Sequence, residues 1–329
     1  MPDETATIAM PSVTMHGIGH SIGAPISINE ACRSDEEKDL VSFFADDGFA
    51  VFIRSAEDIA EMVVRAISDA FTKSPLDRHD IDGIILCTES FWDKDLCVMR
   101  NQPIPDHEKF REGLLQAVFG RCGLIHAHPY GNWLSACANF VSTVNVAQAL
   151  IASGQHNNIA VVMADRLAPQ GSRIMRSRAS ILSDMASCFF MGRLRYGYAI
   201  RHVVQHVATS VYLAQNSSDV QQRVLTTIGE LKIFAQKVQS ATGRNIGDYQ
   251  RICIDCLCSP WIRLISEGLG VDQRRLCASE KAAYAHAFAM DNLLALSKLN
   301  QTGELKSGGE VALLNLGPWA YGLVVIEVL

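Results

Sequence analysis

The sequence predicts an α/β fold made of two similar halves, and three observations carry the prediction. Short apolar runs bounded by turn residues have the length of buried strands. Longer stretches of helical pattern lie between these runs, which is the alternation of a layered α/β protein. A helix, a glycine stop and a strand then recur at matched spacing later in the chain. We therefore expect half-domains at residues 1–192 and 193–329, related by a pseudo-two-fold axis.

The predicted elements follow each other along the chain in a regular way. The apolar runs expected to form buried strands are Ile81–Cys87, Ile159–Ala164, Ile252–Leu257, Val311–Leu316 and Leu323–Val328. Helical stretches separate them, among them Ala56–Lys73 and Phe140–Ser153. Strands that are apolar along their whole length indicate a sheet covered on both faces by helices.

The internal repeat pairs Cys137 with His286. Cys137 precedes a helical stretch that ends at Gly154, 17 positions later, and His286 precedes one that ends at Gly303, also 17 positions later. Related segments also stand upstream of each unit, at residues 80–87 and 248–255. If central helices face each other across a two-fold axis, the two helix starts meet near the axis. A cysteine and a histidine at these positions form a nucleophile and its base.

Composition and charge exclude several classes of protein. Apolar residues make up 48% of the chain and charged residues 19%, an ordinary globular mixture. The net charge of −6 argues against a nucleic-acid binder, which needs a basic face. The acidic N-terminus lacks a signal-peptide pattern, and no apolar run reaches the length of a membrane span. The 10 cysteines form no regular framework, so we expect reduced thiols in a cytoplasmic protein.

Several segments, in their order, resemble ketoacyl-ACP synthase III enzymes. They are the cysteine segment 134–140 with 149–154 and 161–165, the segment 183–187, and the glycine-containing loop 316–322. The resemblance covers the chain from Ile81 to Leu329. It implies a thiolase fold, in which the two halves form five layers (αβαβα). It also implies a homodimer that uses acyl-CoA or a phosphopantetheine-linked acyl group as substrate and needs no other cofactor.

The chain departs from the family at two catalytic positions. The family's nucleophile corresponds to Cys137, but its histidine is replaced by Cys258 and its asparagine by His286. Asp291 follows five positions after His286. This His-x4-Asp pattern resembles a subgroup of acyltransferases and starter-unit loaders from polyketide and antibiotic pathways. In that subgroup the histidine, oriented by the aspartate, serves the nucleophile, which assigns Cys137, His286 and Asp291 as catalytic residues.

The resemblance also implies residues that bind the substrate. The backbone N–H groups of Cys137 and Gly317 correspond to the family's oxyanion hole, and Pro318 has no N–H to offer. Arg263 matches the arginine that meets CoA phosphate or the carrier protein. Arg173, Arg176 and Arg178 form a second basic cluster, for which a carrier-docking role competes with an ordinary solvated face. The stretch from Trp92 to Gly113 is expected to set substrate choice.

Other candidates have weaker support. His206 and Cys258 are possible second-site residues, and for His206 a structural role is the preferred interpretation. Cys253, Cys256 and Cys258 do not indicate a metal site, because alternate strand residues face opposite sides and no second ligand cluster completes the site. Cys137 and His286 also have a structural alternative, as a small buried apolar residue and a core histidine.

The sequence therefore predicts an acyltransferase with an acyl-Cys137 intermediate. Acyl-CoA or acyl carrier protein loads the cysteine, and a carrier or a small molecule then accepts the acyl group. One alternative is a decarboxylative condensing enzyme. Such an enzyme needs two hydrogen-bond donors on the extender's thioester oxygen, and the thiol of Cys258, at the position of the family's histidine, is a weak donor. The other alternative is a non-catalytic subunit of a related heterodimer.

Overall fold

The computed structural model describes residues 13–90, 107–168, 171–175, 177–215, 217 and 219–329. The strands of its N-terminal half are β1 (Thr14–Ile22), β2 (Ala24–Ser27), β3 (Val51–Arg54), β4 (Gly83–Cys87), β5 (His128–Asn132), β6 (Asn158–Asp165) and β7 (Met185–Gly192). Those of the C-terminal half are β8 (Tyr198–Val207), β9 (Arg251–Ile254), β10 (Leu276–Ala278), β11 (Glu310–Leu316) and β12 (Ala320–Val328). The α-helices are α1 (Asp35–Asp46), α2 (Ile59–Thr72), α3 (His107–Leu115), α4 (Asn139–Ala152), α5 (Thr209–Ala214), α6 (Val220–Thr242), α7 (Ser259–Leu269) and α8 (Asp291–Gln301).

The large sheet repeats one strand order in each half of the chain. In the described residues it runs β10-β9-β11-β12-β8-β1-β7-β6-β4-β5, so β9, β10, β11, β12 and β8 mirror β4, β5, β6, β7 and β1. In each half the second strand from the outer edge, β4 or β9, is parallel to both neighbours, and the next two strands, β6–β7 or β11–β12, are antiparallel. The halves join where β1 pairs with β8. The division predicted after residue 192 falls between β7 and β8.

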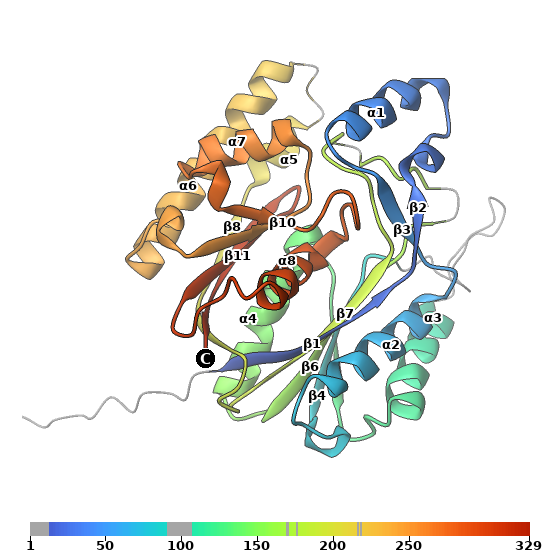
Figure 1. The fold of residues 1–329 in the computed structure, drawn as a ribbon. Coiled ribbons are helices and arrows are strands. Elements are labelled where there is room, and N and C mark those ends of the chain that lie inside the picture. Colours follow the sequence, from blue (N-terminus) through green and yellow to red (C-terminus); the bar gives the residue numbers. More distant parts are fainter. Residues whose placement is uncertain (1–12, 91–106, 169–170, 176, 216, 218) are drawn as a thin grey trace, which may run out of the picture.

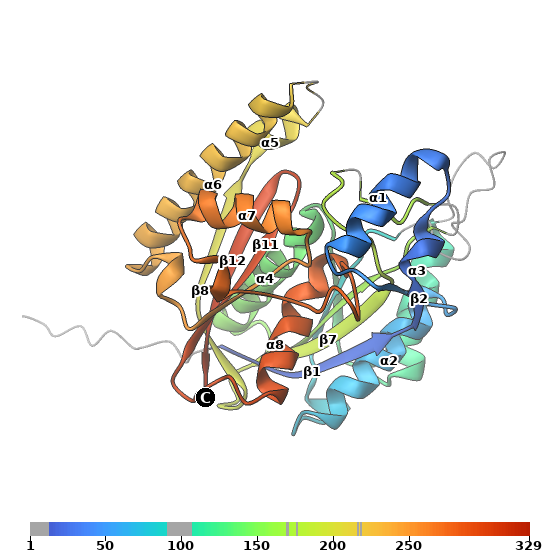
Figure 2. The same cartoon turned by 45° about the horizontal axis from the view of Figure 1, so that its top comes forward.

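Helices α4 and α8 lie side by side in the middle of the molecule, between the two halves of the sheet (Figures 1 and 2). Their buried side chains, such as Val144 on α4 and Leu296 on α8, share one apolar cluster with inward-facing residues of both halves. Helices α2 and α3 cover the outer face of the N-terminal half, and α6 and α7 cover that of the C-terminal half. The layers are thus αβαβα, as predicted.

The glycine stops of the repeat end the two central helices in the same way. Gly154 after α4 has φ +77° and Gly303 after α8 has φ +69°. Residues with side chains rarely adopt this left-handed conformation, whereas glycine does so at little cost. The spacing read from the sequence therefore corresponds to equivalent helix ends.

Two predicted strands are shorter than their apolar patterns suggested: β4 begins at Gly83 rather than at Ile81, and β9 is shortened at its other end. β9 ends at Ile254 rather than at Leu257. Beyond it the Cys256 N–H donates to the Asp291 side chain at 2.6 Å. The Asp255 side chain accepts the N–H of Leu316 at 2.8 Å. Since these hydrogen bonds to side chains replace the sheet ladder, the apolar run leaves the strand early.

In the part of the chain that the structure describes, no helix has the length and apolar content needed to cross a bilayer.

Candidate active site

Cys137 and His286 each follow an alanine held in a left-handed backbone conformation. Cys137 lies in the 3-10 turn Ala136–Ala138, directly before α4, and Ala136 has φ +49°. His286 lies before the 3-10 turn that leads into α8, and Ala285 has φ +53°. This conformation is uncommon for a residue with a Cβ and is often found at functional sites. The two halves thus present the thiol and the imidazole from equivalent turns.

The structure brings the three predicted catalytic residues together in one line. Cys137 Sγ lies 3.4 Å from His286 Nε2. On the other side of the ring, His286 Nδ1 lies 2.5 Å from Asp291 Oδ2. Asp291 Oδ1 accepts the N–H of Ala287 at 2.8 Å, and Asp291 Oδ2 also accepts that of Cys256. With these backbone donors fixing the carboxylate, the ring is oriented with Nε2 toward the sulfur.

The site is largely desolvated, and the loss of water changes the pKa of both the Cys137 thiol and the His286 ring. His286 and Asp291 are buried, and Cys137 is half-buried. Burial raises the pKa of the Cys137 thiol to about 11; His286 lowers it, while Asp255 and Glu89 raise it further. Burial opposes the imidazolium, yet the Asp291 and Cys137 side chains together hold the pKa of His286 well above its usual value.

The surroundings of Cys137 disfavour a free thiolate, although the residue lies directly before α4. Desolvation of the sulfur and the two nearby carboxyl groups disfavour the thiolate, because a charge in a low-dielectric interior is costly. The raised pKa of His286 makes its ring a good acceptor for the thiol proton. The thiolate is therefore expected to form as an ion pair with imidazolium when the substrate arrives.

The turn between β11 and β12 lies against the Cys137 turn, but its geometry differs from the predicted oxyanion hole. A Cβ on Gly317 would lie 2.8 Å from Ser135 O and 3.5 Å from Ala138 N, so only glycine fits this approach. The Gly317 N–H donates to Ala320 O at 2.8 Å. In this conformation it is used within the tight hairpin, and Gly317 does not offer the predicted donor. The Cys137 N–H remains the predicted donor.

Arg173 is the clearest correction among the predicted binding residues. It is 5% exposed, and its guanidinium forms a bidentate pair with Asp184, at 2.6 Å to Oδ1 and 3.0 Å to Oδ2. A buried arginine whose two guanidinium nitrogens are bonded to the Asp184 carboxylate cannot also dock a carrier protein. Ser55 N and Leu167 N donate to the same carboxylate, which makes the pair part of the core. The sequence shows the basic cluster but not the pairing of Arg173 with Asp184, 11 positions later.

The other predicted residues lie apart from the Cys137–His286 pair. Cys258 stands at the residue before α7, lies in a separate apolar cluster, and directs its thiol to Arg178 O at 3.9 Å. His206 pairs with Tyr321 across β8 and β12 and contacts Glu230 at 2.7 Å. The face of the sheet that carries His206 and Tyr321 packs on α6. Gly322, the residue after Tyr321, points to the opposite face and approaches Val141 of α4. Neither residue is brought to the site.

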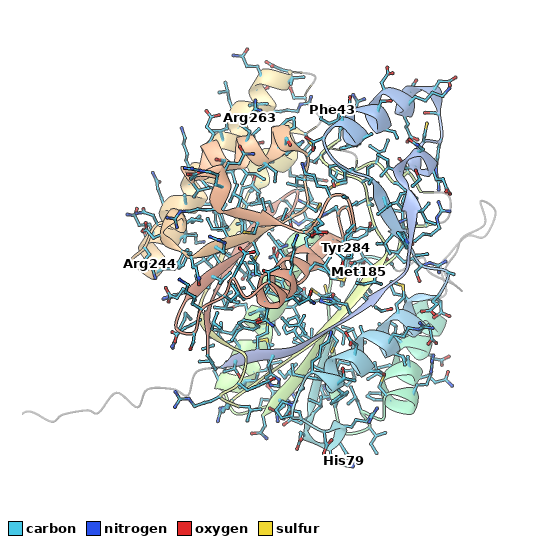
Figure 3. The ribbon with its side chains drawn as sticks, in the orientation of Figure 1. Phe43, His79, Met185, Arg244, Arg263 and Tyr284 are labelled. Atoms are coloured by element: carbon cyan, nitrogen blue, oxygen red, sulfur yellow. The ribbon has the colours of Figure 1, made fainter. Side chains whose placement is uncertain are left out.

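Arg263 is exposed on α7, at the periphery of the molecule, whereas Tyr284, two residues before His286, lies near its centre (Figure 3). The role of Arg263 in binding CoA or a carrier protein stays a prediction. Arg176 and most of the 92–113 stretch lie outside the described residues. Among the residues that the structure describes, no group of three or more His, Cys, Asp and Glu side chains is placed to hold a metal ion.

Two acidic residues that sequence reasoning missed act on the site. Glu89 follows β4 and Asp255 follows β9, and both raise the pKa of Cys137. Glu89 keeps a solvent-accessible face, yet the protein around its carboxyl raises its own pKa, which His286 partly offsets. The signal was present in the sequence, because each follows a buried parallel strand, and the carboxyl ends of such strands commonly form ligand sites.

Comparison with known proteins identifies the fold. No protein-family model and no curated protein sequence matches the chain. Similar solved structures include ChlB3, described as an acyltransferase, with 16% identity, a TM-score of 0.76, and coverage of 97% of this chain and 98% of that one. Cerulenin-bound OleA of Xanthomonas campestris has 15% identity, a TM-score of 0.73, and coverage of 97% and 99%. The synthase III FabH of Pseudomonas aeruginosa has 17% identity, a TM-score of 0.73, and coverage of 96% and 98%. The chain thus has the thiolase fold of ketoacyl-ACP synthase III-like proteins, as the sequence resemblance predicted.

Proposed function

We propose that the chain is an acyltransferase that carries its acyl group on Cys137. The observation that supports this most directly is the line formed by Cys137 Sγ, the His286 ring and the Asp291 carboxylate, with separations of 3.4 Å and 2.5 Å. A nucleophile, a base and a group that orients the base make up the arrangement used for acyl transfer on many folds. The solved structures with the same fold include one described as an acyltransferase.

The reaction proceeds in two half-steps. His286 Nε2 takes the thiol proton, the Cys137 sulfur attacks the thioester carbonyl, and the tetrahedral intermediate collapses. The bond from the carbonyl carbon to the donor sulfur breaks, and the leaving thiolate takes the proton from His286. In the second half-step His286 takes a proton from the acceptor's hydroxyl, amine or thiol, and this group attacks the carbonyl carbon of the acyl-Cys137 thioester. The bond from that carbon to the Cys137 sulfur breaks, and the leaving thiolate of Cys137 takes the proton back from His286. No metal or organic cofactor is required by this scheme.

The chemistry of the donors favours acyl transfer over decarboxylative condensation. Condensation needs two hydrogen-bond donors on the extender's thioester oxygen. Cys258, at the position of the family's histidine, is buried in another cluster with its thiol directed to Arg178 O. Among the residues that the structure describes, His286 is the hydrogen-bond partner of the thiol, at 3.4 Å, and it is occupied as the base. We therefore propose that the acceptor is an oxygen, a nitrogen or a carrier thiol rather than a carbanion.

The proposal is tested by intact-mass analysis of the protein after incubation with acetyl-, malonyl-, hexanoyl- and palmitoyl-CoA. We expect one stable acyl adduct, absent in Cys137→Ala. The matched control is Cys32→Ala, which removes another half-buried cysteine and should keep the adduct. If no donor gives an adduct and iodoacetamide shows no selectivity for Cys137, the nucleophile is refuted. Release of carbon dioxide from malonyl-CoA together with a β-keto product indicates condensation instead.

The remaining features of the proposal follow the family resemblance. The donor is an acyl-CoA or an acyl carrier protein, Arg263 meets its phosphate, and the protein acts as a cytoplasmic homodimer. Loading of an acyl unit in a polyketide or antibiotic pathway is the proposed setting. Arg263→Glu should then raise the KM for the acyl-CoA donor with little change in kcat, because Arg263 is an exposed residue of α7 that takes no part in the Cys137–His286–Asp291 contacts.

A further inference from the structure

A chain of buried polar side chains lies beside the Cys137–His286 pair. Asp255 follows β9, Asn315 is near the end of β11, and Asn292 is the second residue of α8. Asn315 Nδ2 donates to Asp255 Oδ1 at 2.7 Å, and Asn292 Nδ2 donates to Asn315 Oδ1 at 2.6 Å. All three residues are at most 2% exposed. The chain thus links the ends of two strands to the start of the helix that carries Asp291.

The second oxygen of Asp255 reaches the turn that covers the cysteine. Leu316 N donates to Asp255 Oδ2 at 2.8 Å. The next residue, Gly317, makes the close approach to Ser135 and Ala138 on either side of Cys137. One carboxyl group therefore touches the turn that packs against the neighbours of Cys137 and, through the asparagines, the start of the helix that carries Asp291.

A carboxylate is needed for this double contact. Both of its oxygens accept, whereas an amide at position 255 offers one acceptor and presents an N–H₂ group to the other donor. A carboxyl is also an expensive group to bury, and it lies near Asp291 as well. Burial raises the pKa of Asp255 to about 7, His286 lowers it, and Asp291 raises it. Burying the Asp255 carboxyl costs stability. Its presence is therefore better explained by a role in the active site than by packing.

We propose that Asp255 is a positioning residue. Its two oxygens hold the turn at 316–320 and the start of α8 in fixed relation, so that the Cys137 sulfur and the His286 ring meet at reacting distance. The effect of Asp255 on the rate of acylation rests on the proposed acyl transfer, whereas its effect on the ionisation of the Cys137 thiol does not. Small displacements of reacting groups by mutations away from the chemistry can cost about 100-fold in rate.

The test compares Asp255→Asn with the reciprocal double variant Asp255→Asn/Asn315→Asp. In the double variant the amide at 255 accepts from Leu316 N–H and donates to the new carboxylate, which still accepts from Asn292. We expect Asp255→Asn to lower the rate of Cys137 acylation about 10- to 100-fold. The double variant should recover most of the loss. Asp39→Asn, an exposed Asp-to-Asn change on α1, is the matched control and should react like the unmodified chain.

A second measurement separates positioning from folding and from the proposed function. The rate of iodoacetamide reaction at Cys137 is followed against pH by intact mass. Because the Asp255 charge raises the pKa of Cys137, its profile should move to lower pH in Asp255→Asn and stay in place in Asp39→Asn. This readout needs no acyl donor, so it remains decisive if no acyl-CoA reacts with the unmodified chain, the result that would refute acyl transfer itself.

The outcomes that overturn the inference are specific. Acylation of Asp255→Asn within about threefold of the unmodified rate, or an unshifted alkylation profile, shows that the carboxylate does not act on the site. A double variant as slow as the single variant, or one that fails to fold by thermal melting, shows that the hydrogen-bond pattern is not what positions the turn. Recovery in the double variant together with the acidward shift in the single variant supports it.

Discussion

Asp291→Asn replaces one carboxylate oxygen in the centre of the site with an N–H₂ group. The carboxylate accepts three N–H groups, from the His286 ring and from the backbone of Ala287 and Cys256. An amide has one oxygen, so at least one of these donors loses its acceptor. An unsatisfied buried donor costs about 1–3 kcal/mol, and we expect the free energy of unfolding to fall by that amount.

The effect on reactivity should be larger than the effect on stability. If the amide oxygen stays on the Ala287 N–H, its N–H₂ group takes the place of Oδ2 and faces both the Cys256 N–H and His286 Nδ1. That nitrogen must then be an acceptor, which puts the ring proton on Nε2, where the thiol proton has to go. The corresponding change in a Ser-His-Asp triad costs about 10⁴-fold in kcat. Since a thiol ionises more readily than a hydroxyl, we expect a loss of about 10²- to 10⁴-fold in acylation rate.

The assay is single-turnover acylation with the most reactive CoA ester, followed by quenching and intact mass, with iodoacetamide as a donor-independent probe. Thermal melting on the same samples gives the change in stability. Asp39→Asn is again the control, because it makes the same chemical change at an exposed position of α1. If Asp291→Asn stays folded and both reactions remain within about threefold of the unmodified chain, Asp291 does not orient the base.

Other changes at and near the site should have distinct signatures. Glu89→Gln should move the alkylation profile of Cys137 to lower pH, because the Glu89 charge raises the pKa of the thiol, and His286→Ala should move it to higher pH; the same shift direction in both would contradict this. Gly317→Ala should lower stability by about 1–3 kcal/mol and reduce acylation, because its Cβ would collide with Ser135 O. Gly229→Ala on α6, where a Cβ meets no atom within 4 Å, should leave acylation unchanged and keep or raise the melting temperature; equal losses in both glycine variants would refute the close approach. Arg173→Ala should cost about 3–5 kcal/mol in unfolding free energy, because it leaves the Asp184 charge buried and unpaired. An undiminished melting temperature for Arg173→Ala would restore this arginine as a surface docking residue.

Local pattern and repetition made much of the site predictable. The 17-residue interval from Cys137 to Gly154 and from His286 to Gly303 marks equivalent helices, and the structure places them as the central pair, α4 and α8. The two-fold relation then brings Cys137 and His286 together although 149 positions separate them. A repeat encodes this distant contact because each half folds to the same unit and the axis fixes how the units face each other.

Contacts between segments without such a repeat could not be read from the chain. The partner of Arg173 is Asp184, across a short β-bridge, and the sequence showed only a basic cluster. The Gly317 N–H is taken by Ala320 because of the hairpin's conformation, which the motif did not reveal. Both depend on side-chain and turn geometry that several elements set together.

The sequence by itself determined the fold class, the two halves, and the identity of the cysteine, histidine and aspartate that meet in the centre. Only the tertiary structure decided the electrostatics of that centre. It showed that burial, together with Glu89 and Asp255, raises the pKa of Cys137, and that the Asp255 network ties its turn to α8. The physical reason is that periodicity records which face of an element is buried, whereas a pKa depends on all the charges and the lack of water around one atom, and these come from every part of the chain.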